Sequence, residues 1–333
     1  MSDGRPVANS VYFYAPNQGA SIFFAAAFAV SGLAHIGQCF YYRSWSISSL
    51  LPFFCALLTA GYATRSYGAF HYDDPQIYTA SLLLIYASPP ILALANHLTL
   101  TRLFYFVPYH APLHPSRMVV IFSALTAVTE LLTIAGIAYL TDRGAPDKSI
   151  SVGDTLTKAS LVLQLLVTVV FFLLAGTYHA ACHRGRIMRN KRVARPLMTA
   201  YASMLMVFGR TIYRMAEHFG VPASRKGVDP MSLDPVVRFE WYFLVFDAAL
   251  MLVGVVVWNL SHPAGHLPGD SRLYLAQDGR TVIKGPGWKD SRSKTETIFN
   301  PFATLRTTDG HQKKFWESNG YQMGGRVRRA GVA

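Results

Sequence analysis

Charge is scarce in this sequence. Asp, Glu, Lys and Arg make up 15% of its 333 residues, whereas a soluble domain usually carries about 25%. Hydrophobic residues reach 51% and aromatic residues 13%. This composition argues against a soluble globular domain and predicts a membrane protein.

Cysteine is scarce as well, and Cys39, Cys55 and Cys182 all lie within or at the ends of apolar runs. A disulfide-stabilised secreted protein carries paired cysteines in its loops, so no disulfide framework is expected. The first 19 residues lack the basic-then-apolar pattern of a cleavable signal peptide. We expect the first apolar segment to serve as an uncleaved anchor.

Motifs of well-known enzymes are missing. The sequence contains no G-x-x-x-x-G-K-[ST] phosphate loop, no H-E-x-x-H zinc motif and no G-x-S-x-G nucleophile turn. No nucleophile–base pair or metal-ligand set stands out either. We therefore predict that the protein is not an enzyme and uses neither cofactor nor metal, and an intramembrane enzyme is the weakest alternative.

Long apolar runs are what the sequence does contain. A helix needs about 20 such residues to cross a bilayer, and the qualifying stretches are 20–42, 46–64, 76–100, 118–140, 157–181, 197–217 and 240–261. The predicted fold is all-α, a polytopic bundle of seven transmembrane helices within 20–261. It follows an extracellular N-terminal segment, 1–19.

Basic residues predict the orientation of the bundle. The connections after the first, third and fifth predicted spans contain no Asp or Glu, and their basic residues are Arg43, Arg102, Arg117, Arg184, Arg186, Arg189, Lys191, Arg192 and Arg195. Because Lys and Arg are enriched in cytosolic loops, these connections are expected in the cytosol and the N-terminus outside. An odd number of spans then leaves the C-terminal segment, 262–333, in the cytosol.

The C-terminal segment is basic and has no sustained apolar period. It carries twelve Lys or Arg against six acidic residues. This composition predicts a mostly disordered tail. We expect the tail to bind anionic lipids of the inner leaflet rather than nucleic acid, because the preceding spans tether it to the membrane.

The sixth predicted span carries full charges inside an apolar run. Arg210, Arg214 and Glu217 have the spacing i, i+4, i+7 and share one helical face, close to Tyr213. A charge near the bilayer centre costs a few kcal/mol, so such residues normally face the bundle and pair there. These ions either clamp two helices together or line a polar cavity that handles a charged headgroup, and both roles can hold.

The seventh predicted span offers the partners. Glu240 and Asp247 are seven residues apart and are expected on one face. At about 1.5 Å per residue, Arg210 and Asp247 both lie about 10 Å below the outer boundary. We therefore predict a contact between Arg210 and Asp247, with Arg214 nearer to Glu240 or Glu217.

Two further polar residues interrupt predicted spans. Glu130, in the fourth span, has no obvious local partner, so it is either protonated or paired with a distant arginine. Gln164, in the fifth span, is expected to hydrogen-bond to another helix. The predicted substrate-binding or translocation residues are thus Glu130, Gln164, Arg210, Tyr213, Arg214, Glu217, Glu240 and Asp247.

The charged segments also carry a family resemblance. RTIYRMAEHFG at 210–220, EWYFLVFDAALM at 240–251 and His262-Pro263 are its most specific parts, supported by GYATR at 61–65. From about residue 12 to 263, the sequence resembles the fungal lipid-translocating exporter family, seven-helix proteins associated with aminocholesterol resistance. It departs from the family pattern at Thr126, where an Asp is usual, and Glu130 lies one helical turn further on.

The resemblance implies a plasma-membrane exporter or translocase of amphipathic lipids. Its substrates would be sphingoid long-chain bases or sterol-like toxic amphiphiles, and its activity would confer resistance to them. A cationic headgroup would lie near Asp247, Glu240 or Glu130. The alternative is a seven-helix lipid receptor or sensor that signals through its cytosolic loops.

Overall fold

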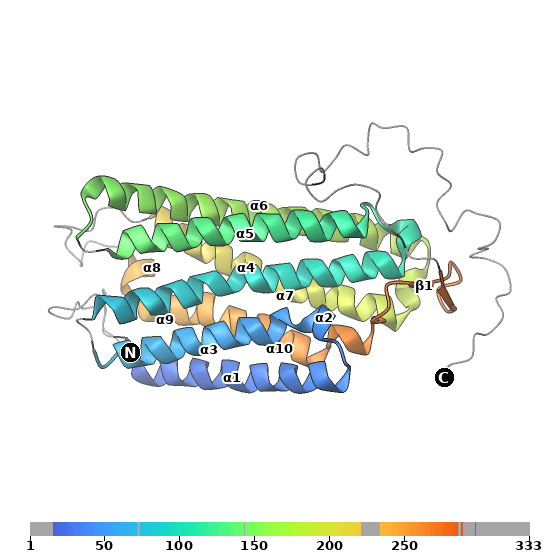
Figure 1. Cartoon of the computed structure of the whole chain (residues 1–333), viewed down its shortest axis with the longest axis horizontal. Helices are drawn as coiled ribbons and strands as arrows, with labels where there is room; N and C mark the ends of the chain where they lie inside the picture. The colour runs from blue at the N-terminus through green and yellow to red at the C-terminus, as the bar shows by residue number, and fades with distance from the viewer. Residues whose placement is uncertain are drawn as a thin grey trace.

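The computed structural model of the protein describes residues 16–71, 74–142, 144–220, 234–285, 288 and 297. Its long helices lie side by side in one bundle (Figure 1). The α-helices are α1 (Gln18–Tyr41), α2 (Trp45–Ser48), α3 (Leu50–Gly68), α4 (Pro75–Phe106), α5 (Pro115–Thr141), α6 (Asp147–Arg184), α7 (Lys191–Phe219), α8 (Pro235–Arg238), α9 (Glu240–Phe243) and α10 (Leu250–Leu260). A π-helical segment, η4 (Leu244–Ala249), joins α9 to α10 into one continuous final helix.

Five helical segments are long and apolar enough to cross a bilayer. They are α1, α4, α5, α6 and the segment Glu240–Gly265. The protein is therefore an integral, multi-pass membrane protein. Two more of the predicted spans also coincide with long helices, but α3 has only 19 residues, and α7 begins with a basic run and contains the charges of 210–217.

Successive long helices run in opposite directions through the bundle. α1 therefore begins at one end, and the β-hairpin that follows the final helix lies at the other (Figure 1). We call the second end the basic end, because it contains the connections 42–49, 107–114 and 185–190 and the segment 263–285. The sequence predicts that these basic connections share one side of a membrane, and the structure places them at one end of the bundle.

Part of the C-terminal segment is folded, although the sequence predicts a mostly disordered tail. β1 (Leu273–Leu275) and β2 (Val282–Lys284) pair in antiparallel fashion, and the side chain of Tyr274 is fully buried. Tyr109 donates a hydrogen bond to the carbonyl of Ala276 at 3.0 Å. Strands of three residues are too short to leave a periodic signal in the sequence. The hairpin is held instead by contacts with loops that are distant in the sequence. The prediction for the end of the tail lies outside the described residues.

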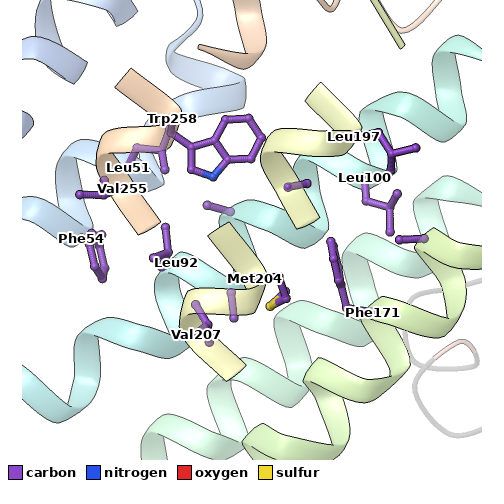
Figure 2. Close-up of a cluster of buried hydrophobic side chains, with 14 of the residues drawn as sticks. Leu51, Phe54, Leu92, Leu100, Phe171, Leu197, Met204, Val207, Val255 and Trp258 are labelled. Carbon is purple, nitrogen blue, oxygen red and sulfur yellow. The ribbon is translucent and has the colours of Figure 1, made fainter. Parts of the chain in front are cut away.

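The apolar core joins α3, α4, α6, α7 and α10 toward the basic end. Figure 2 shows its members converging between these helices: Leu51, Phe54, Leu92, Leu100, Phe171, Leu197, Met204, Val207, Val255 and Trp258. The indole N–H of Trp258 donates to the side-chain oxygen of Asn96 at 2.8 Å, and the Asn96 amide donates to Ser203 at 3.2 Å. Such polar bonds fix the register of helices that pack otherwise by shape alone.

Two consecutive prolines lie inside α4. Pro89 and Pro90 have no N–H groups, so the carbonyls of Ile85 and Tyr86 lose their intrahelical donors. Both prolines are buried between helices, and a membrane helix tolerates such a break where its neighbours cover the backbone. The break divides α4 into a half beside the apolar core and a half toward the opposite end.

α5 and α6 approach each other closely through glycine. A Cβ atom added at Gly136 would lie 2.9 Å from the backbone nitrogen of Thr157, and one at Gly153 would lie 2.9 Å from the carbonyl oxygen of Gly136. Small residues allow membrane helices to pack backbone against backbone. This contact holds the α5–α6 pair at the distance that places their polar residues together.

The close approach predicts the outcome of two alanine substitutions. Gly136→Ala should destabilise the detergent-solubilised protein by about 1–3 kcal/mol, because the added methyl group overpacks the α5–α6 contact. Gly176→Ala on α6 is the matched control, since no atom lies within 4 Å of its added Cβ. Thermal unfolding followed by gel-filtration recovery measures both, and equal melting temperatures would contradict the proposed packing.

Candidate functional site

The carboxylate of Asp247 lies at the centre of a buried charge network. Its Oδ1 accepts a hydrogen bond from Nε of Arg210 at 2.5 Å, and its Oδ2 accepts one from Nη2 of Arg214 at 2.6 Å. All three side chains are at most 2% exposed. The predicted contact between Arg210 and Asp247 is confirmed, and Asp247 also binds the second arginine.

The backbone at Asp247 is π-helical. The segment Leu244–Ala249 interrupts the α-helical bonding of the final helix, and π-turns are found frequently at functional sites. The wider turn changes the angle between Glu240 and Asp247 relative to a regular helix. The two acids, expected on one face of the span, bind different helices: Glu240 contacts Arg65 of α3, and Asp247 contacts Arg210 and Arg214 of α7.

Arg214 has partners on three helices. Its Nη1 donates to Oε2 of Glu217 at 2.6 Å and to the hydroxyl of Tyr86 on α4 at 2.7 Å. The Tyr86 ring also lies below the guanidinium, with 4.2 Å from Cζ to the ring centroid, a cation–π arrangement. The Tyr86 hydroxyl lies 2.8 Å from Nε2 of His218. The predicted nearness of Arg214 to Glu217 is confirmed.

Glu240 forms a separate buried pair with Arg65 of α3. Nη2 of Arg65 lies 2.8 Å from Oε1 of Glu240, and both side chains are 3% exposed. The backbone N–H of Asn17 donates to Oε2 of the same carboxylate at 2.7 Å. Arg65 ends the GYATR stretch and lies one residue beyond the predicted span 46–64. The helix α3 continues four residues further than that span, to Gly68, so Arg65 is still helical and buried in the bundle.

The remaining predicted residues border this network. Tyr213 is buried, with its ring 6.0 Å from that of Phe246. Oε1 of Gln164 on α6 lies 3.5 Å from Nη1 of Arg210, so Gln164 does contact another helix as expected. Glu130 makes no hydrogen bond through either oxygen within the described residues, although both atoms are buried. The structure thus joins six of the eight residues through contacts: Gln164, Arg210, Tyr213, Arg214, Glu217 and Asp247. Glu240 pairs separately with Arg65, and Glu130 has no hydrogen bond among the described residues.

A small cavity lies next to Gln164. It has a volume of about 20 Å³, and its polar walls come from Thr126, Thr129 and Thr168 as well as Gln164. Pro89 and Pro90 close it on the α4 side. A space of this size holds at most about one water molecule. Most of its wall is apolar, and the cavity is too small for a lipid headgroup.

The charges of the network balance. The guanidinium groups of Arg65, Arg210 and Arg214 face the carboxylates of Glu217, Glu240 and Asp247. Removing one partner of a buried ion pair typically costs 3–5 kcal/mol, because the other charge is left without compensation. The ion pairs of the network therefore compensate one another's charge. A cation or anion that enters the network would change which of these pairs form.

Asp247→Asn should destabilise the protein by about 3–5 kcal/mol, since it leaves two buried guanidinium groups without their shared anion. Glu217→Gln should cost less, because Glu217 is 22% exposed and binds only one of them. Thermal unfolding in detergent compares the two variants. A loss for Glu217→Gln as large as that for Asp247→Asn would show that Asp247 is not the centre of the network.

The Arg65–Glu240 pair predicts a non-additive double substitution. Arg65→Met and Glu240→Gln should each lower stability by about 3–5 kcal/mol, because each leaves an uncompensated charge. The double variant should be more stable than either single one, since it buries no unpaired ion. Expression yield and melting temperature measure the cycle, and strictly additive losses would rule out a direct interaction.

Comparison with known proteins places the chain in a family. The model of the family "RTA1 like protein" matches residues 53–270. The "Lipid-translocating exporter-like protein RTA1" of Leptosphaeria maculans is 40% identical over 90% of this chain and 59% of its own length. The chain therefore spans about three fifths of that relative. No solved structure matches significantly.

Two more distant relatives carry related names. The "Lipid-translocating exporter-like protein RTA1" of Ajellomyces capsulatus is 28% identical over 73% of this chain and 77% of its own length. The "Probable lipid transporter atnI" of Emericella nidulans is 24% identical over 78% of this chain and 69% of its own length. The family model covers the whole charge network, from Arg65 to Asp247. The chain belongs to the RTA1-like family of membrane proteins.

Proposed function

We propose that the protein is a translocase that moves amphipathic lipids with a cationic headgroup across the plasma membrane. Its relatives are named as lipid-translocating exporters or lipid transporters. Sphingoid long-chain bases have this chemistry, and their export would confer resistance to toxic amphiphiles. The protein acts by binding and moving its ligand, without catalysis and without a cofactor.

In this proposal all seven long helices cross the bilayer. α3 and α7 carry buried arginines, whose charges are paired with carboxylates inside the bundle. Because the charges are paired, these two helices can cross the bilayer despite their low hydropathy. The basic end lies in the cytosol, following the positive-inside bias, and the N-terminus lies outside. The basic residues of the C-terminal segment would then meet the anionic inner leaflet.

The observation that carries the proposal is the neutral charge network inside a membrane protein. Glu217, 22% exposed, is its most accessible carboxylate, and it leads through Arg214 to the buried Asp247. A cationic amine can replace a guanidinium group at either carboxylate, while the acyl chain stays in lipid. Exchanging one ion pair for another lowers the cost of bringing the headgroup into the bilayer.

Purified protein in liposomes tests the proposal. A fluorescent sphingoid base added to one leaflet should reach the other at least about tenfold faster than in empty liposomes, which corresponds to a barrier lowered by about 1.4 kcal/mol. Gly176→Ala should retain this rate, because nothing lies near its added Cβ. Glu217→Gln, which keeps the Asp247 centre intact, should slow crossing and so show that the network carries the lipid.

Two results would contradict translocation. Crossing no faster than in empty liposomes, with a protein that elutes as a folded species, would remove the transport function. Saturable binding of the lipid without faster crossing would favour the receptor alternative, in which the ligand rearranges the arginine–carboxylate pairs as a switch.

A further inference from the structure

Glu130 is a buried acid outside the paired network. It lies in the middle of α5, and both of its carboxylate oxygens are covered by protein atoms, with no hydrogen-bond donor among the described residues. An ionised carboxylate buried without donors or a counter-ion costs several kcal/mol. In the present conformation the stable form of Glu130 is therefore the neutral, protonated one.

Arg210 is the buried cation whose polar contacts reach toward α5, through Gln164 and Ser160 of α6. Its Nε binds Asp247, but its Nη2 is buried and makes no hydrogen bond within the described part of the chain. Its Nη1 is only 3.5 Å from Gln164, a long contact. Arg210 therefore has hydrogen-bonding capacity left for a second anion.

A polar connection runs between α5 and Arg210. The hydroxyl of Thr133, one turn beyond Glu130 on α5, lies 2.6 Å from that of Ser160 on α6. Ser160 accepts a hydrogen bond from Nε2 of Gln164 at 3.4 Å, and Gln164 reaches Arg210. The cavity of about 20 Å³ at Thr126 and Thr129 adjoins the same face. These groups form a polar line from α5 to Arg210 that begins one helical turn from Glu130.

The charge count links this proton to the ligand. With Glu130 protonated, three guanidinium groups balance three carboxylates in the buried ion pairs of the described residues. Binding one cation at Asp247 or Glu217 leaves the buried set with one excess positive charge. Loss of one proton from Glu130 restores neutrality.

We propose that Glu130 is the proton site of the translocase, and that the protein exchanges one proton for each cationic lipid headgroup it binds. This inference rests on the proposed function. In the exchange, the O–H bond of Glu130 breaks and its proton leaves to water, while the ammonium headgroup enters unchanged, so charge and atoms balance. A pH gradient of one unit would then sustain an about tenfold ratio of cationic lipid between the leaflets.

Several titratable side chains on the helices that pack against α5 already have hydrogen-bond or ion-pair partners. The helices that pack against α5 are α4 and α6, and their titratable side chains include Tyr86 and His97 on α4 and the Asp154–Lys158 pair on α6. Arg210 of α7 is reached through Gln164 of α6. Tyr86 binds Arg214 and His218, and Lys158 lies 2.7 Å from Asp154. Nδ1 of His97 lies 2.7 Å from the carbonyl oxygen of Ala93, and its ring lies against Phe122. Glu130, by contrast, has no hydrogen-bond partner for either oxygen among the described residues.

Proton release on ligand binding tests the inference directly. The full-length protein in weakly buffered detergent, with a pH indicator dye, is mixed with a trimethylated sphingoid base, whose permanent charge can neither bind nor release protons. We expect about one proton released per molecule bound. An uncharged N-acyl sphingoid base should release none, and Glu130→Gln should bind the charged ligand without releasing a proton.

The outcomes separate this inference from the proposed function. Ligand binding and accelerated crossing without proton release by the wild-type protein would overturn proton exchange and leave translocation standing. Undiminished release by Glu130→Gln would assign the proton to another group. If Glu130→Gln does not fold, Glu130→Asp should restore release, and the wild-type comparison of charged and uncharged ligands still decides the matter. Failure of the wild type to bind either ligand would overturn both proposals.

Discussion

The carboxylate of Asp247, held between Arg210 and Arg214, is the contact on which the rest of the structure depends. Three full charges inside an apolar bundle are tolerable only because each finds an opposite charge within 2.6 Å. This requirement fixes the register of α7 against the final helix. Asp247 lies in the π-helical segment of the final helix, and Glu240 of the same helix binds α3.

Pairing of buried charged and polar groups also links the other helices in the half of the bundle opposite the basic end. Arg65 and Glu240 join α3 to the final helix, Tyr86 joins α4 to Arg214, and Gln164 brings α6 within reach of Arg210. Toward the basic end the contacts are apolar or between neutral polar groups, such as Trp258 with Asn96 and Gln38 with the carbonyl of Asn259. The buried ion pairs of Arg65, Arg210 and Arg214 therefore lie in the half opposite the basic end.

This arrangement constrains any lipid path. A headgroup that enters from the half opposite the basic end meets exchangeable ion pairs, but further movement meets packed side chains and a cavity of only about 20 Å³. Pro89 and Pro90 border this cavity, and the backbone of α4 lacks two helical hydrogen bonds there.

The sequence by itself determined the features that follow from local periodicity and bilayer thickness. The apolar runs coincide with the long helices, and the Arg210–Asp247 contact follows from matching depth on two antiparallel helices. Tertiary structure alone decided which helices are neighbours. The pairing of Arg65 with Glu240, 175 residues apart, the sharing of Asp247 by two arginines and the isolation of Glu130 all depend on that choice. No local rule encodes it, because helical period assigns a side chain to a face but not to a partner.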